Sequence, residues 1–216
     1  MFIAFDGIDG AGKTTQVDIL KENLENLGME VNLNNMGEEG FFDEIFQGIK
    51  KKQWTCSPEI REMLYYFEGT LLGEKIKEQR KVQSRKIEIV DRYILSFLSY
   101  GPLNGVELTT INKIVSDMSW PDIYFYIDMS PEQALERIKK YRKIDFPEIG
   151  CKNVLSNDEN INYQCFVKHQ TKVRENYVCA INNLKKRKKR VVIIDGTLSK
   201  KDIKQIILDE VMLWIK

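Results

Sequence analysis

The chain has 216 residues, 43% of them hydrophobic, which is enough for one α/β domain with a sizeable core and short for two. Its 33 lysines and arginines nearly balance 32 aspartates and glutamates, so no overall field would attract nucleic acid or an anionic membrane, and we expect neither as a partner. No apolar stretch approaches the roughly 18 residues of a membrane span, and no basic segment precedes the apolar start, so we expect a cytoplasmic protein with reduced cysteines.

Short apolar runs typical of buried strands alternate with segments of helical periodicity along the chain. The first strand, residues 1–6, leads into a glycine-rich loop, and a helix over residues 14–27 follows, with Gly28 as its stop. Further strands are expected at residues 31–33, 87–90, 123–127 and 191–194. Further helices are expected at residues 41–51, 58–79, 95–118, 131–141, 164–184 and 200–215. This alternation predicts an α/β fold whose parallel sheet is covered on both faces by right-handed crossovers.

Two local features refine this layout. Ser130 before Pro131 is a typical start of a helix, because serine caps the first turn and proline fits its first position. Residues 143–162 are polar and irregular, with Pro147 and Gly150, and we interpret them as an excursion within one domain rather than a domain boundary.

The glycine-rich loop carries the strongest chemical signal. Gly7-Ile8-Asp9-Gly10-Ala11-Gly12-Lys13-Thr14 satisfies G-x-x-x-x-G-K-[ST] between a predicted strand and a predicted helix. In such a loop the backbone N–H groups surround phosphates, the lysine reaches the β- and γ-phosphates, and the threonine hydroxyl holds Mg²⁺. We therefore expect residues 7–14 with Thr15 to bind ATP and Mg²⁺; a chance glycine-rich turn would not explain the flanking strand and helix.

The surrounding sequence resembles one family of P-loop enzymes. Residues 2–16 closely resemble the opening of thymidylate kinases, and other segments follow in that family's order. These are Asp91-Arg92-Tyr93 with Ser96 and Ser99-Tyr100-Gly101, residues 121–128 and 130–138, Val173-Arg174 with Tyr177, and Ile193-Ile194-Asp195. The resemblance covers nearly the whole chain. It implies a P-loop NTPase fold with a five-stranded parallel sheet, a single domain over residues 1–216 with a lid near residues 138–163, and a homodimer.

The same resemblance implies ATP- and Mg²⁺-dependent phosphoryl transfer to a nucleoside 5'-monophosphate, first of all dTMP. This reaction needs cations that converge near Lys13. Arg92 would bridge the donor and acceptor phosphates and Asp91 would help to place Mg²⁺, although the two residues could also form a surface ion pair. Asp9 matches the position that contacts the acceptor sugar, or it is a solvated loop residue. Tyr100 is the further expected acceptor contact.

A second source of cations lies in the predicted lid. Some thymidylate kinases carry an arginine inside the P-loop and others carry it in the lid; here position 10 is glycine, so a lid cation is required. We expect Arg142 to be that catalytic cation and Arg137 to pack on adenine, although a run of cations is usually a solvated helix face. Tyr141 stands where an arginine is common in the family. The cations that could replace Arg142 are Lys139, Lys140 and Lys143.

The predicted acceptor pocket departs from the family. Residues 34–39 replace an Arg-Glu-Pro-like stretch and bring no phosphate-binding arginine, Gly69 stands where an arginine reads thymine, and Gly101 stands where a glutamine contacts the base. We expect Tyr65 to stack on the base, and base specificity to be relaxed or redirected. The adjacent aromatic residues Tyr65, Tyr66 and Phe67 could equally be core.

Two other functions stay open, and a third is disfavoured. The chain could be a kinase of the same fold with another deoxynucleotide or a non-nucleotide acceptor, or a nucleotide-binding protein without efficient turnover. A GTPase switch is disfavoured, because Asn112-Lys113-Ile114-Val115 has valine where guanine recognition needs aspartate. We interpret the basic run at residues 185–190 as hydrated cations at a helix C-terminus rather than a nucleic-acid site. Three of the cysteines, Cys151, Cys165 and Cys179, lack the paired spacing of a zinc site.

Overall fold

The computed structural model describes residues 1–36, 42–51, 53–82, 86–150 and 155–215. Its centre is a five-stranded, all-parallel sheet, which confirms the expected fold class, and the strand order is β2-β3-β1-β4-β5. The strands are β1 (Phe2–Asp6), β2 (Val31–Asn35), β3 (Ile87–Asp91), β4 (Ile123–Asp128) and β5 (Val191–Asp195). β1 lies in the middle and all five of its residues are buried. Four of the five strands end in an aspartate, and because the strands are parallel these carboxylates meet at one edge of the sheet.

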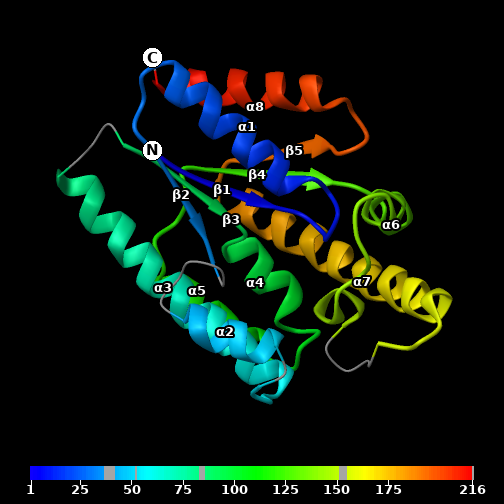
Figure 1. Ribbon diagram of the computed structural model, residues 1–216. Coiled ribbons are helices and arrows are strands. Elements are labelled where there is room, and N and C mark those ends of the chain that lie inside the picture. Colours follow the sequence, from blue (N-terminus) through cyan, green and yellow to red (C-terminus); the bar gives the residue numbers. More distant parts are fainter. Residues whose placement is uncertain (37–41, 52, 83–85, 151–154, 216) are drawn as a thin grey trace.

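Helices cover both faces of the sheet (Figure 1). They are α1 (Lys13–Asn26), α2 (Asp43–Lys50), α3 (Pro58–Val82), α4 (Ile94–Tyr100), α5 (Leu108–Asp117), α6 (Pro131–Lys139), the 3-10 turn η1 (Phe146–Ile149), α7 (Glu159–Lys186) and α8 (Lys200–Ile215). Alternate residues of β1 pack on opposite sides: Ile3 and Phe5 contact the layer of α1 and α8, whereas Phe2 and Ala4 contact the layer that includes α3, α4 and α7. This two-sided burial explains why β1 and β4 are nearly continuous apolar runs, whereas the edge strands β2 and β5 are only partly buried.

Two predicted helices have different bounds in the structure. The single helix expected over residues 95–118 is wrong, because the chain turns between α4 and α5. The amide of Asn104 bonds to the carbonyls of Tyr100 and Gly101, and Gly105 adopts a positive φ of 100°. The helix expected over residues 164–184 is longer, since Asp158 caps the first turn of α7 through the amide of Asn160.

The predicted start of α6 is confirmed. Ser130 accepts a bond from the amide of Gln133 at the start of α6, and Pro131 occupies its first turn. The segment expected to be irregular over residues 143–162 contains η1, a turn closed by a capping box between Asp145 and Glu148, but its last residues from Glu159 onward already belong to α7. Within the described ranges, no helix is both long and apolar enough to cross a membrane.

Candidate active site

The glycine-rich loop joins β1 to α1 at the carboxyl edge of the sheet. Gly10 and Gly12 have φ values of 81° and 97°, and a Cβ on Gly10 would lie 2.8 Å from the carbonyl oxygen of Ala134, so this position requires glycine. The ammonium of Lys13 is buried and donates to the Ile8 carbonyl at 3.0 Å. The loop thus presents backbone N–H groups, a helix N-terminus and a buried lysine to one point, which is the arrangement that binds phosphates.

A hydroxyl and a carboxylate meet beside the loop in a way that fits Mg²⁺. Thr14 Oγ1 donates to Asp91 Oδ2 at 2.8 Å, and in the described structure the buried Asp91 Oδ1 has no hydrogen-bond partner. Among the described residues, no three His, Cys, Asp or Glu side chains gather as a metal cage. A magnesium ion that is coordinated mainly by water and substrate phosphates needs only one or two such protein ligands, so Thr14 and Asp91 suffice.

Burial perturbs two ionisable groups at the base of the loop. Burial, and then the nearby charge of Arg92, lower the pKa of Lys13 to about 8. Burial raises the pKa of Asp6 to about 6, although the Ser96 hydroxyl donates to its carboxylate at 2.6 Å. The other oxygen of Asp6, Oδ2, is buried without a hydrogen-bond partner in the described structure. Bound phosphates would raise the pKa of Lys13 again, because their negative charge favours the charged form of the lysine.

Arg92 is held in an unusual conformation at the end of β3. Its φ is 68°, the left-handed region that non-glycine residues rarely adopt. The guanidinium donates to the Gly7 carbonyl at 3.2 Å and the Tyr177 hydroxyl at 3.3 Å, forms an ion pair with Asp9, and lies 5.1 Å from the centre of the Tyr100 ring. Strained backbone of this kind concentrates at functional sites, where surrounding contacts maintain it.

Asp9 is the carboxylate around which the acceptor side is organised. One oxygen pairs with Arg92, and the other accepts from the Tyr100 hydroxyl at 3.2 Å and from Gln170 Nε2 at 2.8 Å. Burial by itself would raise the pKa of Asp9, but the charges of Arg92 and Lys13 and these hydrogen bonds keep the pKa below its ordinary value. Asp9 is therefore not a solvated loop residue.

Sequence reasoning missed Gln170. Its signal was a polar residue on the buried face of α7, at helical spacing from Phe166, Val173 and Tyr177, which are all fully buried.

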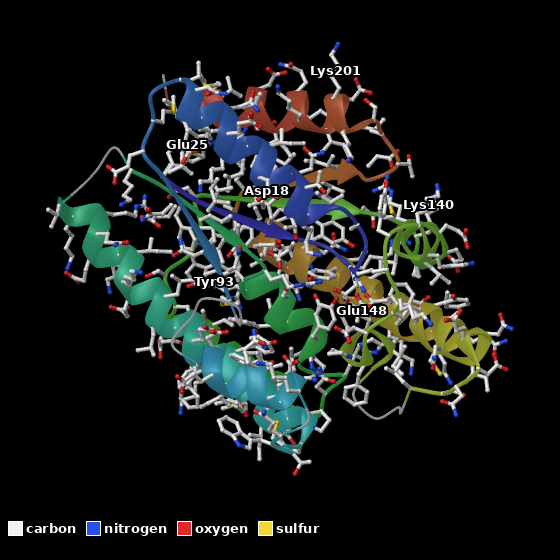
Figure 2. All side chains as sticks on the ribbon, viewed as in Figure 1. Asp18, Glu25, Tyr93, Lys140, Glu148 and Lys201 are labelled. Carbon is white, nitrogen blue, oxygen red and sulfur yellow. The ribbon has the colours of Figure 1, made fainter. Side chains whose placement is uncertain are left out.

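Arg137, on α6, and Arg142, in the predicted lid, have different partners. Arg142 forms a two-pronged ion pair with the buried carboxylate of Glu148, with one bond of 2.9 Å, and also donates to the Lys143 carbonyl. Figure 2 shows Glu148 on the side of the molecule where α6, η1 and α7 meet. Arg137 instead donates to the carbonyls of Ala11 at 3.3 Å and Gly196 at 2.6 Å, beside the phosphate loop.

Arg137 also lies beside a hollow in the surface. Arg137 borders a surface hollow of about 360 Å³, which is also lined by Met129, Lys140 and Thr197. Of the alternative lid cations, Lys139 and Lys143 pair at the surface with Glu136 and Glu159.

Aromatic side chains fill the space beside Gly69 and Gly101, the two glycines of the predicted acceptor pocket. A Cβ on Gly69 would lie 2.6 Å from Cζ of Phe97, and a Cβ on Gly101 would lie 1.8 Å from the Tyr66 hydroxyl. Tyr66 is buried and donates to the Phe97 carbonyl at 3.3 Å. The spaces in which the family places an arginine and a glutamine are therefore occupied here by neighbouring rings rather than left open.

Tyr65, the expected stacking residue, lies at the rim of this region. Its ring stacks on Phe46 of α2, with centroids 4.2 Å apart and an interplanar angle of 19°. Arg61 precedes Tyr65 by one helical turn on α3, and its charge acts on Tyr65 and also on His169 of α7. Arg61 is thus a cation of α3 whose charge also reaches His169 on α7, and no motif in the sequence marks it. Of the neighbouring aromatic residues, Tyr66 is core and Phe67 is 57% exposed.

The remaining predicted features have structural roles. Asn34 bonds to the Glu88 carboxylate at 3.0 Å, while residues 37–39 of the replaced stretch lie outside the described residues. In the basic run, Lys189 lies over the Trp120 ring and Arg190 pairs with Glu210. Of the cysteines named as poor zinc ligands, Cys165 and Cys179 are free and Cys151 lies outside the described residues.

Comparison with known proteins gives one consistent family. The sequence model described as "Thymidylate kinase" matches residues 5–207. A probable thymidylate kinase of Sulfurisphaera tokodaii is 34% identical over 68% of this chain and 73% of its own length. The thymidylate kinase of Thermosipho africanus is 32% identical over 64% of this chain and 71% of its own length. Probable thymidylate kinase 1 of Saccharolobus solfataricus is 29% identical over 81% of this chain and 80% of its own length.

Proposed function

The chain belongs to the thymidylate kinase family and is a nucleoside-monophosphate kinase that phosphorylates dTMP to dTDP with ATP, and we propose that Lys13, Asp91, Arg92 and Arg142 carry this reaction. One observation supports the assignment above all. The P-loop lysine, the strained Arg92 and the Thr14–Asp91 pair converge at the carboxyl edge of the sheet, where open α/β sheets bind their ligands.

In the proposed mechanism the site binds two anionic substrates in line. The loop amides and Lys13 hold the β- and γ-phosphates of ATP, and adenine occupies the hollow beside Arg137. Thr14 and Asp91 would hold Mg²⁺, which would neutralise charge on the phosphates. Arg92 contacts two residues of the phosphate loop, Gly7 and Asp9, so its guanidinium is placed to contact the acceptor phosphate while the γ-phosphoryl group transfers.

The acceptor sugar and base are assigned to the other side of Arg92. Asp9 and Tyr100 contact the sugar, and Tyr65 stacks on the base. Arg61 is the further base or phosphate contact, because it lies one turn from Tyr65 on the same helix. A guanidinium only donates hydrogen bonds, so at the 4-position of the base it would fit the O4 carbonyl of thymine and uracil and not the N4 amino group of cytosine.

The lid completes the site in this proposal. Residues 1–216 act as one domain in which the lid near residues 138–163 closes on ATP, and Arg142 neutralises the transferring phosphoryl group. Closure excludes water, which would otherwise compete with the acceptor for the γ-phosphoryl group.

We also propose a homodimer and a cytoplasmic location, as in thymidylate kinases generally. The apolar residues Ile60, Leu64, Phe67 and Leu71 recur at helical spacing on α3, and Ile60 and Phe67 are more than half exposed. A second copy of the chain would cover this stripe. Phe67→Asp should convert the dimer to a monomer in sedimentation equilibrium; a monomeric wild-type chain would refute the assembly.

A coupled ADP-release assay tests the function. The purified chain with Mg-ATP should turn over dTMP, while dUMP and dCMP measure base specificity. Lys13→Ala should lower turnover by at least about 100-fold without unfolding the chain, since one lost phosphate donor has effects of this order. If the folded wild-type protein phosphorylates no nucleoside monophosphate, the proposal fails.

A further inference from the structure

A continuous chain of hydrogen bonds joins Arg142 and Arg92, two arginines of the proposed site. Arg142 forms an ion pair with the Glu148 carboxylate, and the Glu148 carbonyl accepts a hydrogen bond from Gln170 Nε2 at 3.1 Å. Gln170 also donates to Asp9, which forms an ion pair with Arg92. The five residues come from the lid, η1, α7, the phosphate loop and the end of β3. Gln170 is the one member of this chain that carries no charge.

Packing alone does not explain a glutamine at this position. Gln170 is 0% exposed, and it lies on the inner face of α7 in line with Phe166 and Val173, where a methionine or leucine would fit the apolar stripe. A buried primary amide destabilises the fold unless its hydrogen-bonding groups find partners. The reason for a glutamine at this position is therefore to be found in the hydrogen-bond partners of its amide.

All the hydrogen-bonding groups of the Gln170 amide are used, and their partners fix its orientation. Oε1 accepts from the Asp9 amide at 3.3 Å and lies 3.4 Å from the Tyr100 hydroxyl, while Nε2 donates to Asp9 Oδ2 and to the Glu148 carbonyl. A flipped amide would turn an oxygen toward the Asp9 carboxylate and the Glu148 carbonyl, which are both acceptors. The side chain thus links the η1 turn to the phosphate loop in the free protein.

We infer that Gln170 is a positioning residue that couples the lid arginine Arg142 to the acceptor-side pair of Asp9 and Arg92. The inference rests on the proposed function of this site. Because η1 is a single turn, its Glu148 carbonyl and Glu148 carboxylate move together, so the position of Arg142 follows that of Gln170. Acceptor binding at Asp9 and delivery of Arg142 to the phosphates are then one event, which confines full transition-state stabilisation to the complex that contains both substrates.

Gln170→Met tests this role, because methionine keeps the size of the side chain and removes its bonds. We expect kcat with dTMP to fall by about 10-fold, the effect of losing a hydrogen bond to a charged group, while KM for ATP changes by less than about 2-fold. Gln164→Met is the matched control: this glutamine is exposed on the same helix, and its replacement should leave kcat unchanged.

A double-mutant cycle separates coupling from a structural role. If Gln170 acts through Arg142, Arg142→Ala should lower kcat much less in the Gln170→Met background than in the wild type. Two independent, multiplicative losses would overturn the inference, as would a Gln170→Met variant with wild-type kcat. An inactive wild-type chain would instead refute the proposed function.

A second link keeps the test open if Gln170→Met does not fold. Glu148→Gln leaves Gln170 in place and replaces the ion pair between Arg142 and residue 148 by a weaker neutral contact. It should lower kcat and make a further Arg142→Ala substitution nearly silent. Independent effects of Glu148→Gln and Arg142→Ala would overturn the inference.

Discussion

A side chain at position 101 should destabilise the protein, and removal of the Tyr66 hydroxyl should restore part of the loss. Gly101 is helical in φ and ψ, so its backbone tolerates alanine. The obstacle is space: the new Cβ would lie 1.8 Å from the Tyr66 hydroxyl and 2.8 Å from both the Phe97 carbonyl oxygen and Cδ1 of Ile111.

The expected size follows from these contacts. The Tyr66 ring must move and lose its bond to the Phe97 carbonyl, which costs about 1 kcal/mol. Overpacking of the surrounding core adds about 1–3 kcal/mol. For a chain of this size the total corresponds to a fall in Tm of roughly 5–15 °C. Tyr66→Phe alone should cost about 1 kcal/mol, because it removes only the hydrogen bond.

Urea and thermal unfolding of Gly101→Ala, Tyr66→Phe and the double variant provide the measurement. The double variant should be more stable than the sum of the single effects by about 1–2 kcal/mol, because the closest contact is gone. Gly101→Gln, which introduces the glutamine of the family, should lower stability rather than improve the use of dTMP. The reasoning would be refuted by a Gly101→Ala protein within about 0.5 kcal/mol of the wild type.

Three further predictions concern ionisable groups. The pKa of Lys13 is about 8 in the free protein, so the protein should take up part of a proton when it binds ATP at pH 8.5. Titration calorimetry in two buffers of different ionisation enthalpy measures this uptake. Equal binding heats in the two buffers would contradict the prediction. The pKa of Asp6 rises from 3.8 to about 6 on folding, so its contribution to stability is full only well below pH 3.8 and is lost as the pH rises through 6. Relative to Asp6→Asn, the wild type should lose about 2.5 kcal/mol of unfolding free energy between pH 4 and 7, and a pH-independent difference would argue against the shift. Arg174 makes two hydrogen bonds of 2.7 Å to the Asp128 carboxylate. Arg174→Lys keeps the charge but loses this bidentate geometry, and it should lower the free energy of unfolding in urea by about 0.5–1 kcal/mol, because the pair is partly exposed. An unchanged unfolding midpoint would show that the bidentate geometry does not stabilise the protein.

The sequence predicted the strands and the phosphate loop well, because their signals are local. The runs at residues 87–90 and 123–127 fall inside β3 and β4, and Lys13 begins α1. The break between α4 and α5 was missed, because apolar periodicity continues through it. That turn is held partly by a bond from Asn104 to Glu62, which lies 42 residues away, and no pattern within one window contains such a partner.

The candidate site shows the same division between local and distant information. Motifs identified Asp9 and Arg92, but their pairing spans 83 residues, and the bond from Gln170 to Asp9 spans 161. Gly69 and Gly101 were interpreted as lost contacts. The structure adds that Phe97 and Tyr66 fill those spaces, which depends on how α3 packs on α4.

The carboxylates of the site are best understood through the cations that they hold. Arg92 already lowers the pKa of Lys13, so another cation without an anionic partner would make the lysine harder to charge. Asp9 and Glu148 each pair with one arginine, which keeps Arg92 and Arg142 oriented and limits their mutual repulsion. Incoming phosphates then meet cations whose directions are set, and the site spends less free energy on reorganisation as charge develops in the transition state. The ion pairs near the phosphate loop therefore prepare the site for catalysis rather than obstruct it.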